Sequence, residues 1–404
     1  MPYYRSVGEH PRKRHTQFRQ PDGRLYAEEL MGVDGFSADA ALLYHRHLPT
    51  AIVAADVVDE PVTATELRAN LPLAPRHFRT HDVEVGEDLV SGRQLLLGND
   101  DVRVSYVVSE GVSELYRNAI GDELVYVESG SVRLESVFGA LDVGAGDYVV
   151  VPTSTTHRWV ADAGLVRALV IEARGHVRAP RRYLSAGGQF LEHAPYCERD
   201  LRAPVESLLV EAEDDGETPV LVRHRAGLTR FRYLHHPFDV VGWDGCLYPY
   251  ALSIHDFEPI VGRVHQPPPV HQTFEGPNFV VCSFVPRLFD FHPQAVPVPY
   301  NHANVDSDEV LFYVGGDFMS RKGAGIGHGS MSLHPSGFVH GPQPGSAEAA
   351  IGKPATDELA VMVDTFRPLA LGPAARATED PEYAWTWARG LLAHDDPSHP
   401  GLSH

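Results

Sequence analysis

The sequence predicts an all-β protein built from two related β-barrels. Short runs rich in Val, Leu, Tyr and Phe, interrupted by Gly, Asp and Pro, fill residues 100–175 and return between about 240 and 345. Such short apolar runs separated by turn residues are typical of β-sandwiches and barrels. A repeat that links the two regions predicts that they share one fold.

The repeat consists of two landmarks that occur in the same order in each region. An acidic residue, Glu123 or Glu309, begins an apolar run that ends at glycine. Further on, a glycine is followed six residues later by proline and five residues after that by a histidine, which is His157 in the first copy and His340 in the second. The acidic residue precedes this histidine by 34 residues in the first copy and by 31 in the second. The nearly equal spacing indicates an internal duplication.

The whole chain is expected to form five segments around this duplication. In order, these are N-terminal β strands, a degenerate structural barrel, a connecting segment, a metal-binding barrel and a C-terminal extension, at residues 1–99, 100–175, 176–235, 236–345 and 346–404. The C-terminal extension contains Trp385 and Trp387, which we assign to a short helix. Its polar end, residues 394–404, is predicted to be a loose tail.

Composition restricts the classes of partner. The formal charge of −20, from 34 basic and 54 acidic residues, argues against binding to nucleic acid or to anionic membrane surfaces. The charged N-terminus lacks the apolar core of a signal peptide, and no later stretch reaches the roughly 18 apolar residues that span a bilayer. We therefore expect a cytoplasmic protein without a membrane partner.

The cysteines do not form a recognisable motif. Cys197, Cys246 and Cys282 lie far apart in the sequence, so they predict neither a disulfide framework nor a thiolate metal site. We interpret them as small core residues.

Histidines in the second copy predict a metal site. The chain has 23 histidines, and histidine is the commonest metal ligand in proteins. His302 lies seven residues before Glu309, and His340 follows Glu309 by 31 residues. Two imidazoles and one carboxylate can occupy one face of an octahedral ion and leave three positions open, as in oxygen-activating Fe(II) enzymes. The sequence therefore predicts one metal held by His302, Glu309 and His340.

Other residues near these landmarks offer alternatives. Asp306 and Asp308 are rival carboxylates, but Glu309 is the residue that aligns with Glu123, and the two aspartates are expected on a solvated turn. The first copy has Asn118 where a metal-binding histidine should lie. We therefore predict that the first barrel is structural, with a second, weaker metal site as the alternative.

These spacings resemble the two motifs of the cupin superfamily. The resemblance implies a double cupin, in which each barrel is a jelly roll. Asn304 stands where many cupins carry another histidine. This reduces the ligand set to two histidines and one glutamate, which favours iron dioxygenase chemistry over other uses of the cupin fold.

Whole phrases of the chain resemble the homogentisate 1,2-dioxygenase family. The first is L-Y-A-E-E-L-M-G at residues 25–32, and the second is H-P-F-D-V-V-G-W-D-G at residues 236–245. The match continues from His265 through V-P-R, P-Y-N-H and H-G-P, so similar blocks run from about residue 25 to 345.

This resemblance implies an activity and an assembly. It implies a homo-oligomer, a hexamer built from trimers, that uses Fe(II) and O₂ to open the ring of homogentisate to maleylacetoacetate in tyrosine and phenylalanine catabolism. It also assigns His302, Glu309 and His340 to the iron and His265 to the catalytic base. The substrate side of the pocket would contain five further residues, which are Arg287, His271, Tyr300, Phe318 and His334.

The roles of some of these residues stay open. Arg287 is expected either to bind a substrate carboxylate or to form a structural ion pair, and His271 competes with His265 as the base. Phe318 stands nine residues after Glu309, where better-known members carry a substrate-contacting tyrosine. Asn301 replaces an aromatic residue beside the first ligand. Cleavage of a related para-dihydroxylated aromatic, of the gentisate or hydroquinone type, is therefore the alternative activity, and a non-catalytic ligand-binding cupin is the alternative class.

Overall fold

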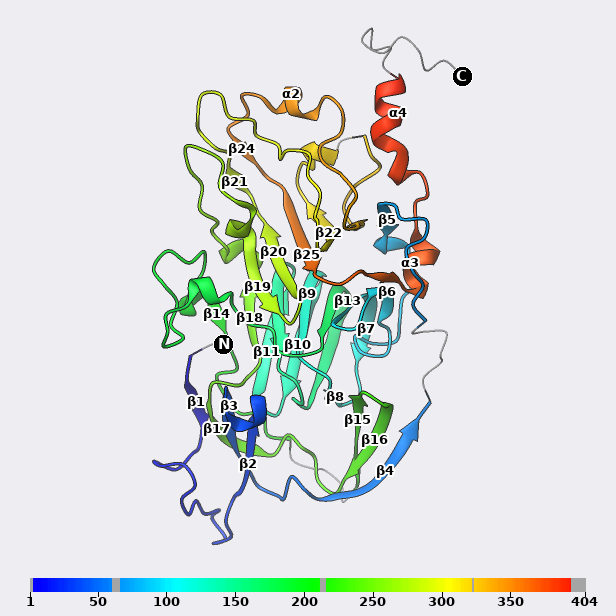
Figure 1. Ribbon diagram of the computed structural model, residues 1–404. Helices are drawn as coiled ribbons and strands as arrows, with labels where there is room; N and C mark the ends of the chain where they lie inside the picture. Colours follow the sequence, from blue (N-terminus) through cyan, green and yellow to red (C-terminus); the bar gives the residue numbers. More distant parts are fainter. Residues whose placement is uncertain (1–2, 60–65, 211–215, 322, 394–404) are drawn as a thin grey trace. The chain divides into compact units, whose positions relative to one another are not determined.

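The computed structural model describes residues 3–59, 66–210, 216–321 and 323–393 of the 404-residue chain (Figure 1). The chain divides into two compact units. Unit 1 comprises residues 1–65, 84–94 and 102–256, and unit 2 comprises residues 66–83, 95–101 and 257–404. The tail predicted at residues 394–404 lies outside the described residues. Within the described parts, no helix is both long and apolar enough to cross a membrane.

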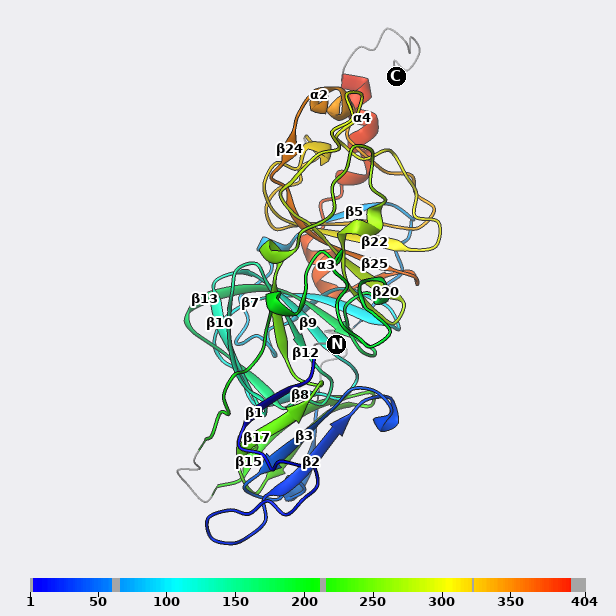
Figure 2. The same ribbon diagram turned by 90° about the vertical axis from the view of Figure 1, so that its left-hand side faces the viewer.

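The strands in the described residues of unit 1 belong to two β sheets. One sheet has the order β1–β17–β3–β2, and Figure 2 shows these strands near one another. The other has the order β14–β18–β12–β9–β13–β8–β15–β16–β4; β7 and β10 also pair with β13, and β11 pairs with β10. The strands are β1 (Arg5–Gly8), β2 (Ala27–Gly32), β3 (Ala40–His45), β4 (Ile52–Val58), β7 (Val102–Val112), β8 (Tyr116–Asn118), β9 (Glu123–Ser129), β10 (Ser131–Ser136), β11 (Gly139–Gly144), β12 (Asp147–Val151), β13 (His157–Ala173), β14 (Leu201–Arg202), β15 (Thr218–His224), β16 (Gly227–Tyr233), β17 (Val240–Gly245) and β18 (Tyr250–Ser253).

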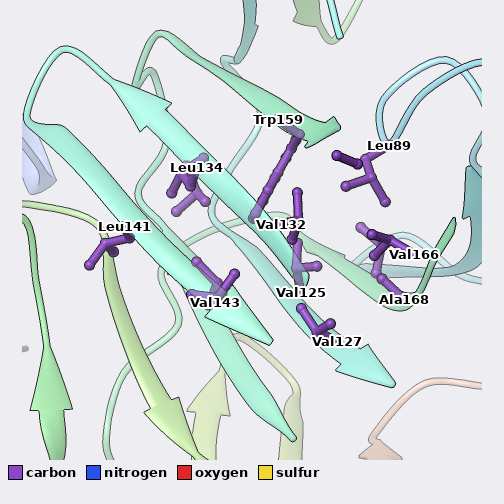
Figure 3. Close-up of a cluster of buried hydrophobic side chains, with 14 of the residues drawn as sticks. Leu89, Val125, Val127, Val132, Leu134, Leu141, Val143, Trp159, Val166 and Ala168 are labelled. Carbon is purple, nitrogen blue, oxygen red and sulfur yellow. The ribbon is translucent and has the colours of Figure 1, made fainter. Parts of the chain in front are cut away.

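Alternating side chains on these strands form the core of unit 1. Val125 and Val127 on β9 point to the same interior as Leu141 and Val143 on β11 (Figure 3). Successive side chains of a strand point to opposite faces, so residues two apart share one face. Trp159 on β13 is 1% exposed and packs in the same cluster.

Unit 2 contains a six-stranded antiparallel sheet with the order β19–β20–β25–β22–β23–β5. Figure 1 shows β20, β25 and β22 side by side. Its strands, and the helices that follow residue 345, are β5 (Arg76–Arg79), most of β6 (Gln94–Gly98), β19 (Gln272–Gly276), β20 (Phe279–Phe284), β21 (Arg287–Leu288), β22 (Asp308–Gly315), β23 (Ser330–His334), β24 (Ala355–Thr356), β25 (Leu359–Thr365), β26 (Ala370–Leu371), α2 (Ser346–Ala350), α3 (Pro373–Thr378), the 3-10 helix η8 (Tyr383–Trp385) and α4 (Thr386–Ala393).

The same arrangement of three strands occurs in each unit. In unit 1, β9 lies between β12 and β13, and in unit 2, β22 lies between β23 and β25. The repeated acidic residues occupy matching places, because Glu123 is the first residue of β9 and Glu309 is the second residue of β22. The predicted all-β class, with two related barrels, N-terminal strands and a short C-terminal helix, is confirmed.

The division into units differs in detail from the five expected segments. Residues 66–83 belong to unit 2, where β5 pairs with β23. Residues 176–235, expected to be a connection, contribute β15 and β16 to the large sheet of unit 1. Such pairings between distant segments are set by long-range contacts, which a local pattern of apolar residues does not encode.

None of the three cysteines forms a disulfide. All three are free thiols; Cys282 is buried, whereas Cys197 and Cys246 are partly buried.

The two aspartates that precede Glu309 differ in exposure. Asp306 is exposed as expected, but the expectation for Asp308 was wrong because it is 4% exposed. Its carboxylate accepts backbone N–H groups from Ser336 and Leu369, each at 2.8 Å, and these hydrogen bonds offset its burial.

Candidate metal centre

Strand pairing brings the three predicted ligands together. Glu309 lies near the start of β22, and the segments that carry His302 and His340 form an antiparallel bridge. His302 donates its backbone N–H to the carbonyl of His340 at 2.8 Å, and His340 donates to the carbonyl of His302 at 2.9 Å. One ligand atom from each of the three residues lies within 4.8 Å of the others.

The side chains of the two histidines are oriented for binding a cation. The Nδ1 atoms of His302 and His340 lie 3.1 Å from the backbone carbonyls of Tyr300 and Phe338. A carbonyl can only accept, so each Nδ1 carries a proton, and each Nε2 is the ring nitrogen that can bind a metal. The two Nε2 atoms lie 3.6 Å and 3.3 Å from the Glu309 carboxylate. Three electron-pair donors therefore converge on one point.

The surroundings of the His340 side chain also indicate whether a metal fits this site. Its side chain is buried, and its Nε2 finds no hydrogen-bond partner among the described residues. An unpaired polar atom in a protein interior is unfavourable unless a ligand or ion satisfies it. A divalent cation bound by His302, Glu309 and His340 would do so, and the residues therefore fit a metal.

The electrostatics of Glu309 favour the same conclusion. Burial opposes ionisation of this carboxyl, but the imidazoles of His302, His334 and His340 lower its pKa well below the usual range. Glu309 is therefore an anion at neutral pH and can neutralise part of a bound cation's charge.

A cavity of about 210 Å³ in unit 2 leads to two of the three predicted ligands. Its lining includes His302 and Glu309 together with four of the residues predicted to act on substrate, namely Arg287, His265, His271 and Tyr300. Apolar side chains, among them Leu311 and Met362, form much of the remaining wall. A concave, partly apolar space with a few polar groups is typical of a site for a small organic molecule.

The two histidines that compete as base have different surroundings. His265 is 54% exposed, and its Nδ1 lies 3.4 Å from a carboxylate oxygen of Asp290. His271 packs against Phe284 at a ring distance of 4.6 Å, and its Nδ1 has no hydrogen-bond partner within the described chain. Burial, together with the charge of Arg287, lowers the pKa of His271 to about 3. His271 is therefore a weak base at neutral pH.

Arg287 lies in the cavity with an acidic neighbour. Its guanidinium is 3.8 Å from the carboxylate of Glu358, which is beyond hydrogen-bond distance, and it donates to the carbonyl of Val285 at 3.0 Å. Burial lowers the pKa of Arg287 and raises that of Glu358. Each charge is therefore only partly compensated by the other, and Arg287 keeps donors that are not used by Glu358.

The other two predicted substrate contacts lie in packed surroundings. Phe318 packs against Tyr313, at a ring distance of 4.9 Å, in an apolar cluster that includes Cys282 and Leu311. His334 is completely buried on β23, directly opposite Glu309 on β22. Both of its ring nitrogens take part in hydrogen bonds within the protein.

Residues not singled out in the sequence also surround the centre. Asp364 on β25 lies opposite Glu309, and burial together with the Glu309 charge raises its pKa to about 7. Asp364 is the one acidic residue in the apolar run L-A-V-M-V-D-T, and this interruption of an apolar strand could have marked it in the sequence as a candidate site residue. Arg321 is buried, and Tyr383 comes from η8 near the C-terminus. No motif in the sequence marked Arg321 or Tyr383.

In unit 1, a guanidinium lies where the repeat would place a metal. Both terminal nitrogens of Arg93 donate to the two carboxylate oxygens of Glu123 at 2.8 Å, and Asn118 donates to Glu123 at 2.9 Å. His157 is completely buried, and its Nδ1 lies 3.0 Å from the carbonyl of Thr155. Burial opposes ionisation of Glu123, but Arg93 lowers its pKa to about 2. The cation that faces Glu123 is therefore a side chain of the protein itself.

A second cavity, of about 280 Å³, lies within unit 1. His45 lies in its wall, with Nδ1 2.7 Å from Asp239 and Nε2 3.0 Å from Glu29. Burial would lower the pKa of His45, but the hydrogen bonds to the two carboxylates raise it to about 9. This arrangement is a partly buried ion network.

Comparisons with known proteins extend over both units. A family model described as homogentisate 1,2-dioxygenase N-terminal matches residues 10–254. A candidate dioxygenase of Saccharolobus solfataricus is 40% identical over 96% of this chain and 99% of its own length. A homogentisate 1,2-dioxygenase of Bradyrhizobium diazoefficiens is 26% identical over 82% of this chain and 77% of its own length. Among solved structures, a cupin 2 conserved barrel domain protein of Leptotrichia buccalis is 7% identical, with a TM-score of 0.33, over 74% of this chain and 100% of that one.

Proposed function

The chain belongs to the homogentisate 1,2-dioxygenase family, and from this premise we propose that it is an Fe(II)-dependent dioxygenase that opens the ring of homogentisate to form maleylacetoacetate. The observation that carries the proposal is the convergence of His302, Glu309 and His340, two of which, His302 and Glu309, line a cavity of about 210 Å³. A cavity of this kind can bring a small aromatic acid to the ligand atoms.

The donor set supports iron as the metal. Two imidazoles and one carboxylate on one face leave open positions, which is the pattern of non-haem Fe(II) oxygenases. Bound Fe(II) would supply the electron transfer from ring to O₂ that the cleavage requires. The protein's part is to direct the Nε2 atoms of His302 and His340 towards the metal position, through the hydrogen bonds at Nδ1, and to keep Glu309 ionised.

His265 is the residue that we propose as general base. It lies in the cavity wall beside Asp290, so a proton taken from a ring hydroxyl would be stabilised by a nearby carboxylate. Removing that proton makes the ring a better electron donor. His271 lines the same cavity, but its pKa of about 3 makes it a poor proton acceptor at neutral pH.

Arg287 and Tyr300 would orient the substrate. The partly compensated guanidinium of Arg287 can accept a substrate carboxylate through charge-assisted hydrogen bonds. The ring of Tyr300 lies 5.3 Å from that of His265, which places an aromatic wall next to the base. The charge of Glu358 beside Arg287 weakens the attraction for an acid, so a hydroquinone-type substrate without a carboxylate stays as the alternative.

We also propose that the first barrel is structural. Arg93 gives Glu123 the positive partner that a metal would otherwise provide, and Asn118 cannot replace a histidine as a strong ligand. The cytoplasmic location and the trimeric or hexameric assembly remain predictions.

Oxygen uptake tests this function directly. The apoprotein would be reconstituted with Fe(II) without oxygen and then mixed with O₂ and homogentisate, gentisate or hydroquinone. We expect O₂ consumption and a ring-opened product with homogentisate. Turnover of only one of the other two compounds would reassign the substrate. No uptake with any of them, despite bound iron, would contradict the dioxygenase and favour a ligand-binding cupin.

A further inference from the structure

The C-terminal segment from Tyr383 to Trp387 contacts the surroundings of two metal ligands. Tyr383 belongs to η8 and is 1% exposed, and Trp387 lies in α4. The two rings are 5.4 Å apart. Nothing in the activity proposed above requires a role for this segment.

The first connection runs through His334 to Glu309. His334 Nδ1 lies 2.9 Å from the Glu309 carboxylate, and His334 Nε2 lies 2.9 Å from the hydroxyl of Tyr383. An ionised carboxylate only accepts, so Nδ1 donates to Glu309 and Nε2 accepts from the tyrosine hydroxyl. Tyr383 therefore fixes both the tautomer and the ring orientation of the imidazole that holds Glu309.

The second connection reaches the residue after His340. The indole N–H of Trp387 donates to the carbonyl of Gly341 at 3.0 Å. Arg321 donates to the same carbonyl, and its guanidinium lies over the Trp387 ring at 5.7 Å. The backbone that carries His340 is therefore held by two donors, and one of them comes from the C-terminal segment.

We propose that Tyr383 and Trp387 are positioning residues of the metal centre, Tyr383 acting on Glu309 through His334 and Trp387 acting on His340 through Gly341. This inference rests on the metal centre proposed above but not on the substrate. Partners that orient metal ligands typically change metal affinity by about 10–100-fold when they are removed. It also gives His334 a role towards the ligand Glu309, in place of a contact with the substrate.

The test uses the full-length protein with Tyr383→Phe and Trp387→Phe. Each change keeps an aromatic ring and removes one hydrogen-bond donor. Thr378→Val is the matched control, because Thr378 donates a hydrogen bond of 2.9 Å to the carbonyl of Ala374 within α3 of the same extension. Fe(II) affinity would be measured anaerobically by competition with a chelator, and the absorption spectrum of Co(II)-substituted protein would report ligand geometry.

We expect the two aromatic variants to bind Fe(II) about 10–100-fold more weakly and to change the Co(II) spectrum, with the control unchanged in both. Affinity and spectrum equal to wild type in both variants would overturn the inference and leave the proposed function intact. An equal loss in Thr378→Val would also overturn it, since the effect would then be general destabilisation. A wild-type protein that binds neither ion would overturn both proposals. If one variant fails to fold, the other still tests its own connection.

Discussion

Replacing Arg93 by methionine is expected to destabilise the protein without creating a metal site. Methionine preserves much of the side-chain volume but removes both donors to Glu123. The side chains of Arg93 and Glu123 are 8% and 1% exposed, so solvent cannot replace the lost partner. Removing one member of a buried ion pair costs about 3–5 kcal/mol, because the remaining charge is left uncompensated.

The pKa of Glu123 gives a second estimate of the same magnitude. Its value in the folded protein is about 2, against an ordinary value of 4.5. At about 1.4 kcal/mol per unit, the native environment stabilises the ionised carboxyl by about 3 kcal/mol. Because the folded pKa is depressed, this stability is present above pH 4.5 and is lost as the pH falls through about 2.

Urea unfolding at pH 7 would measure the free energy of unfolding of Arg93→Met, Glu123→Gln and the double variant. We expect Arg93→Met to lose about 3 kcal/mol or more, and the double variant to recover part of this loss because no buried anion remains. Iron content should stay at the wild-type value. A loss below about 1 kcal/mol would refute the conclusion that this guanidinium occupies the place of a cation. A second bound metal in Arg93→Met would contradict the prediction that the first barrel forms no metal site.

Three further predictions concern the base, the backbone at the metal centre and the ion network of unit 1. His265→Phe should keep iron but lower turnover by about 10²–10⁴-fold, whereas His271→Phe should lower turnover less. An equal loss of turnover in steady-state assays of the two variants would show that His265 is not the base. Gly341→Ala should weaken Fe(II) binding in a chelator competition, because a Cβ there would lie 2.2 Å from Asn301 Oδ1 and 2.8 Å from its Cα; unchanged affinity would contradict this. His45 should add about 3 kcal/mol to the free energy of unfolding, because its pKa is raised from 6.5 to about 9. This contribution is present below pH 6.5 and is lost as the pH rises through 9, so the free energies of unfolding of wild type and His45→Gln should converge at high pH.

The three residues proposed to bind the metal could be selected from the sequence because they occur inside a repeat. Glu309 could be chosen over Asp308 by its alignment with Glu123, and the structure gives a physical reason: Asp308 is already used by two backbone N–H groups. The fold class followed from short apolar runs separated by Gly, Asp and Pro and from the internal repeat; in the structure, residues of such a run two positions apart, such as Val125 and Val127, share one buried face.

The supporting residues could not be predicted in this way. Arg93 precedes Glu123 by 30 residues in a segment without a motif, and its role depends on a long-range contact. Tyr383 reaches His334 from 49 residues further along the chain. Local patterns indicate strands and turns, whereas these contacts depend on how the strands pair and pack.

Metal analysis of the reconstituted protein tests the central claim most directly. After anaerobic loading with Fe(II) and removal of free metal, the wild type should hold one iron per chain. His302→Ala, Glu309→Ala and His340→Ala should each fold and hold none, because the three side chains supply the donors that converge in unit 2. Glu123→Gln and His157→Gln should retain one iron. Full iron retention in any of the three alanine variants, or loss of half the metal in either glutamine variant, would contradict a single centre formed by His302, Glu309 and His340.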